Sequence, residues 1–202
     1  MDAAVMDAKR VLDVAVAGPM LVVTAPVQAA IAVAVRLGRP VLFRQRRPGL
    51  HGEPFTILKF RTMRPVDVGA GRVDDASRMT PLGRFLRAAS LDELPTLLNV
   101  LRGDMSLVGP RPLLMAYLPR YSPAQARRHD VRPGLTGLAQ VSGRNAVGWD
   151  ERLALDVEYV DTRTMRLDLA ILLRTVRTVL RRDGIAAEGE ATMPEFLGRS
   201  AA

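Results

Sequence analysis

The sequence predicts an α/β fold in which a small sheet is surrounded by helices, with a re-entrant membrane helix at the N-terminus and amphipathic helices on a membrane surface. Three patterns support this prediction: an apolar segment from Val11 to Val35, short strand-like runs within residues 41–60, and a basic amphipathic run from Leu167 to Arg182. The 202 residues suffice for one domain with its own core and a separate membrane element. We therefore expect a membrane segment at 1–38 and a membrane-associated domain at 39–202.

The apolar segment has the length of a membrane helix, because about 20 apolar residues cross a bilayer. Asp13 is its only charged residue, and Gly18-Pro19 and Ala25-Pro26 interrupt it. A proline inside a helix removes a hydrogen bond and bends the axis. Basic residues flank both ends of the segment, namely Lys9 and Arg10 before it and Arg36 and Arg39 after it. Positive flanks favour keeping both ends in the cytoplasm. A helix that bends at Ala25-Pro26 and returns to the same face fits both observations; a kinked single span or a buried core helix are the alternatives.

The next segments alternate between strand and turn signals. Residues Val41 to Phe43 and Phe55 to Phe60 are predicted strands, separated by a turn at Arg47-Pro48-Gly49. Val66 to Met79 is expected to be a loop. Thr80-Pro81 begins a helix through about Ala89, because threonine is a good N-cap and proline suits the first helical position.

The second half of the chain is predicted to be mainly helical. A helix from Asp92 to Leu101 should end at Gly103, and another should cover Tyr117 to Arg128, while Pro133 to Asn145 should be a loop with one short strand. From Leu167 to Arg182, leucines and valines recur on one face and arginines on the other, which is typical of a helix on an anionic membrane surface. The alternative is an ordinary helix packed on the core.

Composition narrows the classes of partner. The formal net charge of +8 indicates an anionic partner, namely nucleic acid, an anionic bilayer or a phosphorylated substrate. Only 4% of the residues are aromatic, which argues against a nucleic acid partner bound by stacking. Without cysteine there is no disulfide, thiolate metal site or thiol nucleophile. His51 and His129 have no metal-ligand spacing, and we expect His129 to be structural.

The densest polar segment runs from Arg87 to Pro95. Ser90 and Glu93 match a capping box, in which both simply start a helix. Pro95 argues against this box, because it would fall where its missing N–H is needed. With Asp92 as the N-cap, Pro95 would lie among donors that have no partner anyway. Both carboxylates would then lie at the positive end of a helix, where an aspartate stays ionised and phosphate is attracted. The residues alone still favour a capping role for this pair.

Six stretches of the chain match motifs of one protein family in the same order. They are Phe43–Gly49 (FRQRRPG), Lys59–Met63 (KFRTM), Ser90–Pro95 (SLDELP), Asn99–Ser106 (NVLRGDMS), Val108–Leu113 (VGPRPL) and Arg132–Asn145 (RPGLTGLAQVSGRN). From Lys9 onward the chain closely resembles the small monotopic phosphoglycosyl transferases of the bacterial sugar transferase family. The resemblance implies an enzyme at the cytoplasmic face of the bacterial inner membrane. Such an enzyme moves a phosphosugar from a UDP-sugar to a polyprenyl phosphate such as undecaprenyl phosphate, the first membrane step of glycoconjugate assembly.

The resemblance also implies roles for individual residues. Asp92 would be the nucleophile that expels UMP and carries the phosphosugar, and Glu93 would assist the acceptor or help to hold the required Mg²⁺ with Asp92. Arginines and a metal ion are suited to neutralising a diphosphate during such a transfer. Positions matched to phosphate-facing or polar family residues are Lys59, Arg87, Arg111, Arg144 and Asp156. For Lys59, an exposed strand lysine is the alternative.

One feature departs from the general pattern of the family. Family members often carry Ser-Pro at the helix break, where this chain has Ala25-Pro26. The stretch Ala187 to Pro194, in contrast, resembles the tail of the shortest members and indicates a pathway for an N-acetylated or bacillosamine-type sugar. There are two alternatives to transfer through a covalent Asp92 intermediate. The acceptor could attack the donor directly, or the chain could be a non-enzymatic scaffold that binds membrane or RNA. The sequence does not decide the UDP-sugar, the polyprenol or whether the chain forms a homodimer.

Overall fold

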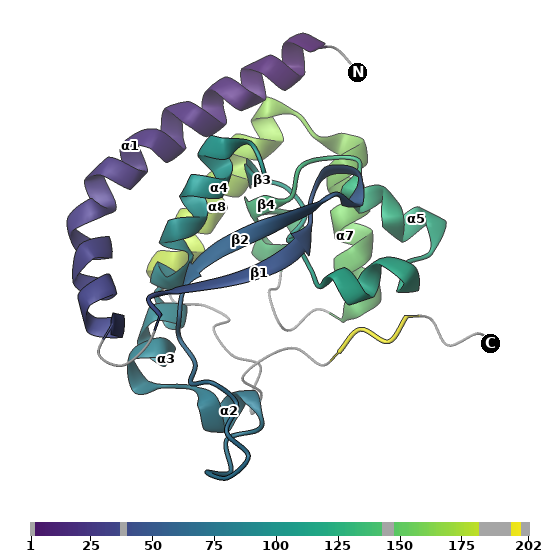
Figure 1. Ribbon diagram of the computed structural model, residues 1–202. Helices are drawn as coiled ribbons and strands as arrows, with labels where there is room; N and C mark the ends of the chain where they lie inside the picture. Colours follow the sequence, from purple (N-terminus) through teal and green to yellow (C-terminus); the bar gives the residue numbers. More distant parts are fainter. Residues whose placement is uncertain (1–2, 37–39, 143–147, 182–194, 199–202) are drawn as a thin grey trace.

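The computed structural model describes residues 3–36, 40–142, 148–181 and 195–198. Helices surround two separate two-stranded sheets, and α1 runs as a long arc along one side of the domain (Figure 1). The predicted architecture holds in outline, but the strands form two small sheets instead of one. In chain order the elements are α1 (Ala3–Arg36), β1 (Leu42–Pro48), η1 (Leu50–Gly52), β2 (Pro54–Phe60), α2 (Asp75–Arg78), α3 (Pro81–Ala88), η2 (Leu91–Thr96), α4 (Leu97–Arg102), β3 (Ser106–Val108), η3 (Met115–Arg120), α5 (Pro123–Ala126), η4 (Arg127–His129), β4 (Gly134–Thr136), α6 (Leu138–Val141), α7 (Trp149–Thr162) and α8 (Met165–Arg181), where η marks a 3-10 helix.

The N-terminal helix α1 remains continuous through both of its prolines, Pro19 and Pro26. It curves as a smooth, unbroken arc (Figure 1), instead of the local bend that was predicted at Ala25-Pro26. Thr24 Oγ1 donates to the Met20 carbonyl at 2.6 Å, a bond that often accompanies helix bending. By length and composition, Ala8–Arg36 could cross a membrane. Re-entry of this helix stays a prediction.

One face of α1 packs against the domain, and its outer face is exposed. Ala17, near the middle of the helix, is fully buried in the main hydrophobic core. Val35 is buried in a second apolar cluster near the C-terminal end of the helix. On the outer face, Val11, Val22 and Val33 are 67%, 75% and 69% exposed. The helix therefore has two regions of buried contact and an exposed apolar face that runs past both.

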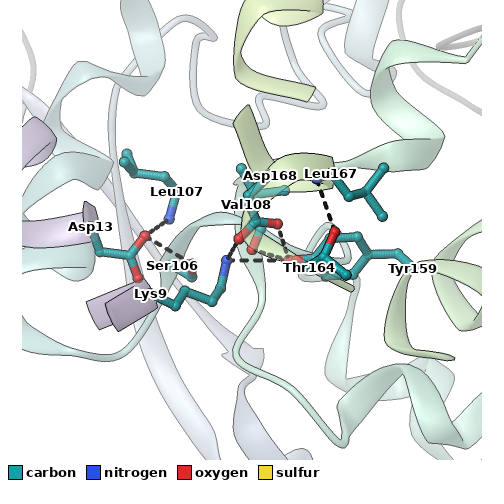
Figure 2. A network of polar contacts seen from close by, with 9 residues as sticks. All are labelled: Lys9, Asp13, Ser106, Leu107, Val108, Tyr159, Thr164, Leu167 and Asp168. Atoms are coloured by element: carbon teal, nitrogen blue, oxygen red, sulfur yellow. Dashed lines mark hydrogen bonds and ion pairs between the residues drawn. The ribbon is translucent and has the colours of Figure 1, made fainter. Parts of the chain in front are cut away.

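The N-terminal contact of α1 includes a buried polar group that we call the anchor network (Figure 2). Lys9 Nζ lies 2.6 Å from Asp168 Oδ2, and the hydroxyl of Tyr159 donates to Asp168 Oδ1 at 2.8 Å. Asp13 Oδ1 accepts from the backbone N–H of Leu107 at 2.8 Å. The members of the network are Lys9, Asp13, Ser106, Leu107, Val108, Tyr159 and Asp168. These contacts join α1 to β3, α7 and α8.

The first sheet is an antiparallel hairpin of β1 and β2, whose register runs from Leu42↔Phe60 to Pro48↔Pro54. β1 is longer than the predicted strand Val41–Phe43, because a run of polar residues hid its continuation. The outer edge of β2 is closed by side chains: Leu58 N donates to Asn99 Oδ1 at 3.0 Å, and Thr96 Oγ1 donates to the Leu58 carbonyl at 2.7 Å. These bonds fix η2 and α4 beside β2.

The second sheet pairs β3 and β4 in parallel. Beside it, the backbones of Gly109 and Gly134 approach each other very closely. A Cβ added to Gly134 would lie 2.1 Å from the backbone nitrogen of Gly109. Only glycine leaves room for this approach, since real Cβ atoms essentially never come so near. The sheet thus positions the segment that follows Gly109.

Several helix predictions were wrong in detail. The helix predicted from Asp92 to Leu101 is divided into η2 and α4, although it ends at Gly103 as predicted, with a φ of 89°. The helix predicted from Tyr117 to Arg128 is broken into η3, α5 and η4, and Pro119 and Pro123 lie in this stretch. Proline removes a helical N–H, so a continuous helix is unfavourable there. α2 and α6 lie in predicted loops, and α7 was not predicted.

Two other helix predictions are confirmed. Thr80 caps α3, because its Oγ1 accepts from Gly83 N at 2.9 Å. α8 covers Met165–Arg181 and has two faces, with Ile171 fully buried in the core and Leu173 and Val176 exposed by 73% and 58%. The helix therefore packs on the core and also exposes an apolar stripe. From the sequence, packing on the core and lying on a membrane surface were alternatives.

A separate aromatic cluster lies beside η3 and α7. Phe196 is 3% exposed and stacks on Tyr121 with ring centroids 5.5 Å apart. Tyr117 and Trp149 complete the cluster through edge and tilted contacts. The short segment 195–198 thus packs against the same region that carries Tyr121.

Candidate active site

Asp92 and Glu93 lie on the short 3-10 helix η2, directly after α3. Ser90 precedes this helix with a φ of 55°, and its side chain makes no capping bond. The capping box of Ser90 and Glu93 is therefore absent, and Asp92 is not the N-cap that the sequence predicted. The left-handed turn at Ser90 starts the helix one residue before Asp92, so both carboxylates fall inside its first turn.

Glu93 is held between two cations. Its Oε1 lies 2.5 Å from Lys59 Nζ and 2.7 Å from Arg111 Nη2. Burial alone would raise the pKa of Glu93, but Arg111 and Lys59 hold it well below its usual range. Burial lowers the pKa of Lys59, and Glu93 opposes that shift. Glu93 is thus an ionised carboxylate with a fixed orientation.

Asp92 shares these surroundings but not these bonds. Its side chain is buried, with the residue 8% exposed, and in the part of the chain that the structure describes no hydrogen bond or ion pair engages its carboxylate. Burial and then Glu93 raise the pKa of Asp92, whereas Lys59, Arg87 and Arg111 lower it. Asp92 is therefore an uncommitted carboxylate in a cationic environment.

Arg87 reaches this environment from the last turn of α3. Its Nε donates to Thr62 Oγ1 at 3.0 Å, just beyond the end of β2. Thr80 Oγ1 donates to the Thr62 carbonyl at 3.0 Å. A Cβ added to Gly83 would lie 2.0 Å from that same carbonyl oxygen, so α3 can approach only because residue 83 is glycine. This close packing sets where Arg87 lies.

Arg111 comes from the rigid Pro-Arg-Pro segment after β3. Its backbone carbonyl accepts from Arg128 Nη2 at 2.7 Å. Asp156, which the sequence placed among the substrate-binding residues, is paired with Arg128 at 2.7 Å and is 2% exposed. It lies behind Arg111 and makes no contact with Glu93. Arg144 falls outside the described residues.

The structure therefore brings together five of the seven predicted site residues: Lys59, Arg87, Asp92, Glu93 and Arg111. Sequence reasoning missed Arg128 and Thr62, which support this group from behind. Thr62 lies within a matched motif, but nothing in the sequence around Arg128 distinguishes it from the exposed arginines nearby. Burial is the signal that separates them.

His129 has the structural position expected of it. It is 9% exposed and its ring lies 5.6 Å from that of Tyr121. Burial, followed by the charge of Arg128, lowers the pKa of His129 to about 4. It is therefore neutral at physiological pH.

Comparison with known proteins identifies the family. A family model described as bacterial sugar transferase matches residues 4–182. An uncharacterised sugar transferase of Bacillus subtilis, EpsL, is 54% identical over 167 residues, which cover 82% of this chain and 83% of that protein. The UDP-glucose:undecaprenyl-phosphate glucose-1-phosphate transferase of Caulobacter vibrioides is 50% identical over 191 residues, covering 87% of this chain and 70% of that protein.

A longer relative shows the same region within a larger protein. The undecaprenyl-phosphate galactose phosphotransferase of Salmonella typhimurium is 40% identical over 195 residues, which cover 87% of this chain but 41% of that protein. These similarities agree with the six motifs and with the clustering of their charged residues around Asp92 and Glu93. They disfavour the non-enzymatic scaffold, because the relatives are named as transferases. The chain is a phosphoglycosyl transferase and belongs to the bacterial sugar transferase family.

Proposed function

We propose that this protein transfers a phosphosugar from a UDP-sugar to a polyprenyl phosphate and releases UMP, with Asp92 as the nucleophile. One observation carries the proposal: of two adjacent carboxylates, Glu93 is held by Lys59 and Arg111, while Asp92 has no hydrogen-bond or ion-pair partner among the residues that the structure describes. A nucleophile needs a free oxygen, and a positioning group needs fixed partners. The named activities of the relatives from Caulobacter and Salmonella fit the same reaction.

The proposed chemistry has two displacement steps at phosphorus. An oxygen of Asp92 attacks the β-phosphorus of the UDP-sugar, and the bond from that phosphorus to the bridging oxygen breaks. UMP leaves with the electron pair of this bond. A phosphate oxygen of the polyprenyl phosphate then attacks the acyl phosphate, which frees the Asp92 carboxylate. Lys59, Arg87 and Arg111 carry positive charge next to this position and would offset the charge of the diphosphate.

The donor set is compatible with Mg²⁺, which we propose as the cofactor. Mg²⁺ favours one or two carboxylates together with phosphate oxygens and water. Asp92 and Glu93 are adjacent carboxylates, and no set of three or more protein ligands occurs among the described residues. The two carboxylates would therefore hold the ion with the donor diphosphate, and the ion would supply further charge neutralisation.

The packing of α1 supports a location at one face of the membrane. A bilayer core is about 30 Å thick, so the two ends of a spanning helix lie on opposite sides. Here Lys9 and Asp13, toward the N-terminal end of α1, and Val35, near its C-terminal end, all pack on the same domain. With basic residues at both ends, this arrangement favours the cytoplasmic face. The exposed apolar stripe of α8, with Arg174 and Arg177 exposed alongside, fits contact with anionic lipid.

The test supplies the donor without the acceptor. Detergent-purified protein with Mg²⁺ would be incubated with UDP-glucose, UDP-galactose and UDP-sugars that carry N-acetyl groups, including bacillosamine-type donors. Stoichiometric UMP and a phosphosugar adduct in the intact mass are expected for one of them, and both should vanish in Asp92→Asn. UMP that appears only after polyprenyl phosphate is added would instead support direct transfer in a ternary complex. An unchanged yield from Asp92→Asn would remove Asp92 as the nucleophile.

A further inference from the structure

Arg128 is a buried arginine whose partners connect it to the active site. It is 2% exposed, and its side-chain nitrogens donate to Asp156, to the Tyr121 hydroxyl and to the Arg111 carbonyl. The shortest of these bonds, at 2.7 Å, run from Nη2 to Asp156 Oδ2 and to the Arg111 oxygen. A buried charge is costly unless it is paired and hydrogen-bonded. The Arg128 guanidinium meets both conditions, because it pairs with Asp156 and donates to two further oxygens.

The Pro-Arg-Pro segment depends on such outside support. Proline has no N–H, so Pro110 and Pro112 cannot donate bonds that would fix the segment. Its carbonyls are instead bound from neighbouring elements, Pro110 by Gly134 N at 2.9 Å and Arg111 by Arg128. The Arg111 backbone is therefore held by Arg128, and its guanidinium pairs with Glu93.

We propose that Arg128, held by Asp156, is a positioning residue that fixes the Arg111 backbone and so directs the Arg111 guanidinium onto Glu93. This inference rests on the proposed function, because it assigns the Arg128–Asp156 pair a part in that reaction. It also gives Asp156 a role different from substrate binding. The pair acts on catalysis only through Arg111.

The chain contains a matched control for this pair. Arg127 precedes Arg128 on η4 and pairs with Asp161 of α7, the same helix that carries Asp156. The side chains of this second pair are 48% and 45% exposed, and neither contacts the active site. The two pairs join the same elements and differ in burial and in the bond to Arg111.

The test replaces each pair by apolar or small residues. Arg128→Met with Asp156→Leu removes the donor to Arg111 without leaving a buried charge, a change that cores commonly tolerate. Relative to wild type, kcat/KM for the UDP-sugar should fall about tenfold, since small displacements of a positioned group cost rate. Arg127→Ala with Asp161→Ala should change it less than twofold. Thermal unfolding of all variants would be recorded alongside.

A double-mutant cycle separates positioning from a general structural effect. If the pair acts through Arg111, the Met–Leu change should lower kcat/KM less than twofold in an Arg111→Ala background. The same tenfold loss in that background, or full activity of the Met–Leu variant in the wild-type background, would overturn the inference.

A second readout does not depend on turnover. Hydrogen exchange of the peptide covering residues 109–118 should be faster in the Met–Leu variant than in wild type, and unchanged in the Arg127–Asp161 control. Equal exchange in all three proteins would overturn the inference. If wild type released no UMP from any donor, the proposed function would fail, while this exchange measurement would still decide whether Arg128 fixes the segment.

Discussion

Two groups of charged residues in this protein, both largely buried, differ in how completely they are paired. In the anchor network, Asp168 accepts from both Lys9 and Tyr159, and Asp13 accepts from β3 (Figure 2). Burial and then Asp168 raise the pKa of Tyr159, so its phenol stays protonated and keeps donating. Each charged member of this network has a partner inside the protein.

The active-site group is incompletely paired. Lys59 and Arg111 share one oxygen of Glu93, Arg87 bonds to a threonine, and Asp92 has no bond in the described part of the chain. Three cations face two carboxylates there, which leaves positive charge for an anionic ligand. The difference indicates that a complete network serves to hold α1 in place, whereas an incomplete one serves binding and chemistry.

The sharpest test of this comparison is Asp92→Asn. Loss of the proposed nucleophile should reduce kcat by about 10⁴-fold or more. Stability at neutral pH should not fall, because burial raises the folded-state pKa of Asp92 above its unfolded value, and an ionised Asp92 therefore costs stability above the unfolded pKa. UMP release and chemical denaturation would measure both. A large loss of stability would place Asp92 with the structural charges.

Glu93→Gln should have the next largest effect. The neutral amide that replaces the carboxylate cannot form ion pairs with Lys59 and Arg111. We therefore expect kcat to fall about 10²-fold in Glu93→Gln. The measurement is steady-state turnover with the donor found for wild type. Activity equal to that of wild type would show that the two cations do not need this carboxylate.

Breaking the anchor network should affect stability and spare chemistry. Asp168→Asn leaves Lys9 without its buried counter-ion and should lower the free energy of unfolding by about 3 kcal/mol. Turnover per folded molecule should stay within twofold of wild type. Arg127→Ala, which breaks an exposed pair, should leave the free energy of unfolding almost unchanged as a control. A tenfold drop in turnover per folded Asp168→Asn molecule would contradict the separation of the two groups.

The smallest expected effect is a shift in the pH profile. Burial and Glu93 raise the pKa of Asp92, and Arg87 lowers it. Activity should therefore fall on the acid side as Asp92 becomes protonated, and Arg87→Met should move this inflection of kcat/KM to higher pH. A shift to lower pH, or none, would mean that Arg87 does not act on the charge of Asp92.

Sequence reasoning named most members of the candidate site but not the frame behind it. Lys59, Asp92, Glu93 and Arg111 lie in the stretches that match the family, and the structure brings them together. Arg128 was missed because its importance comes from burial, which depends on chain segments far away in the sequence.

The fold was predictable where one local signal dominates. Thr80-Pro81 and Gly103 mark helix ends by their own conformational preferences, and both ends were located correctly. The start of η2 was misplaced because Ser90 adopts a left-handed backbone conformation and does not cap the helix with its side chain. The helix expected over Tyr117 to Arg128 is broken because Pro119 and Pro123 lie within it.

The two-point attachment of α1 has a mechanical consequence. A rigid body fixed at one point can swivel freely about it, whereas one fixed at two points can only rock about the line that joins them. Ala17 and Val35 lie at two such contacts, and the exposed Val22 lies between them. With the exposed face of α1 embedded in lipid, as proposed, the domain could tilt only about the line through these contacts. Asp92 would then stay near the lipid phosphates, and the proposed polyprenyl phosphate acceptor would only have to diffuse in the plane of the membrane to meet it.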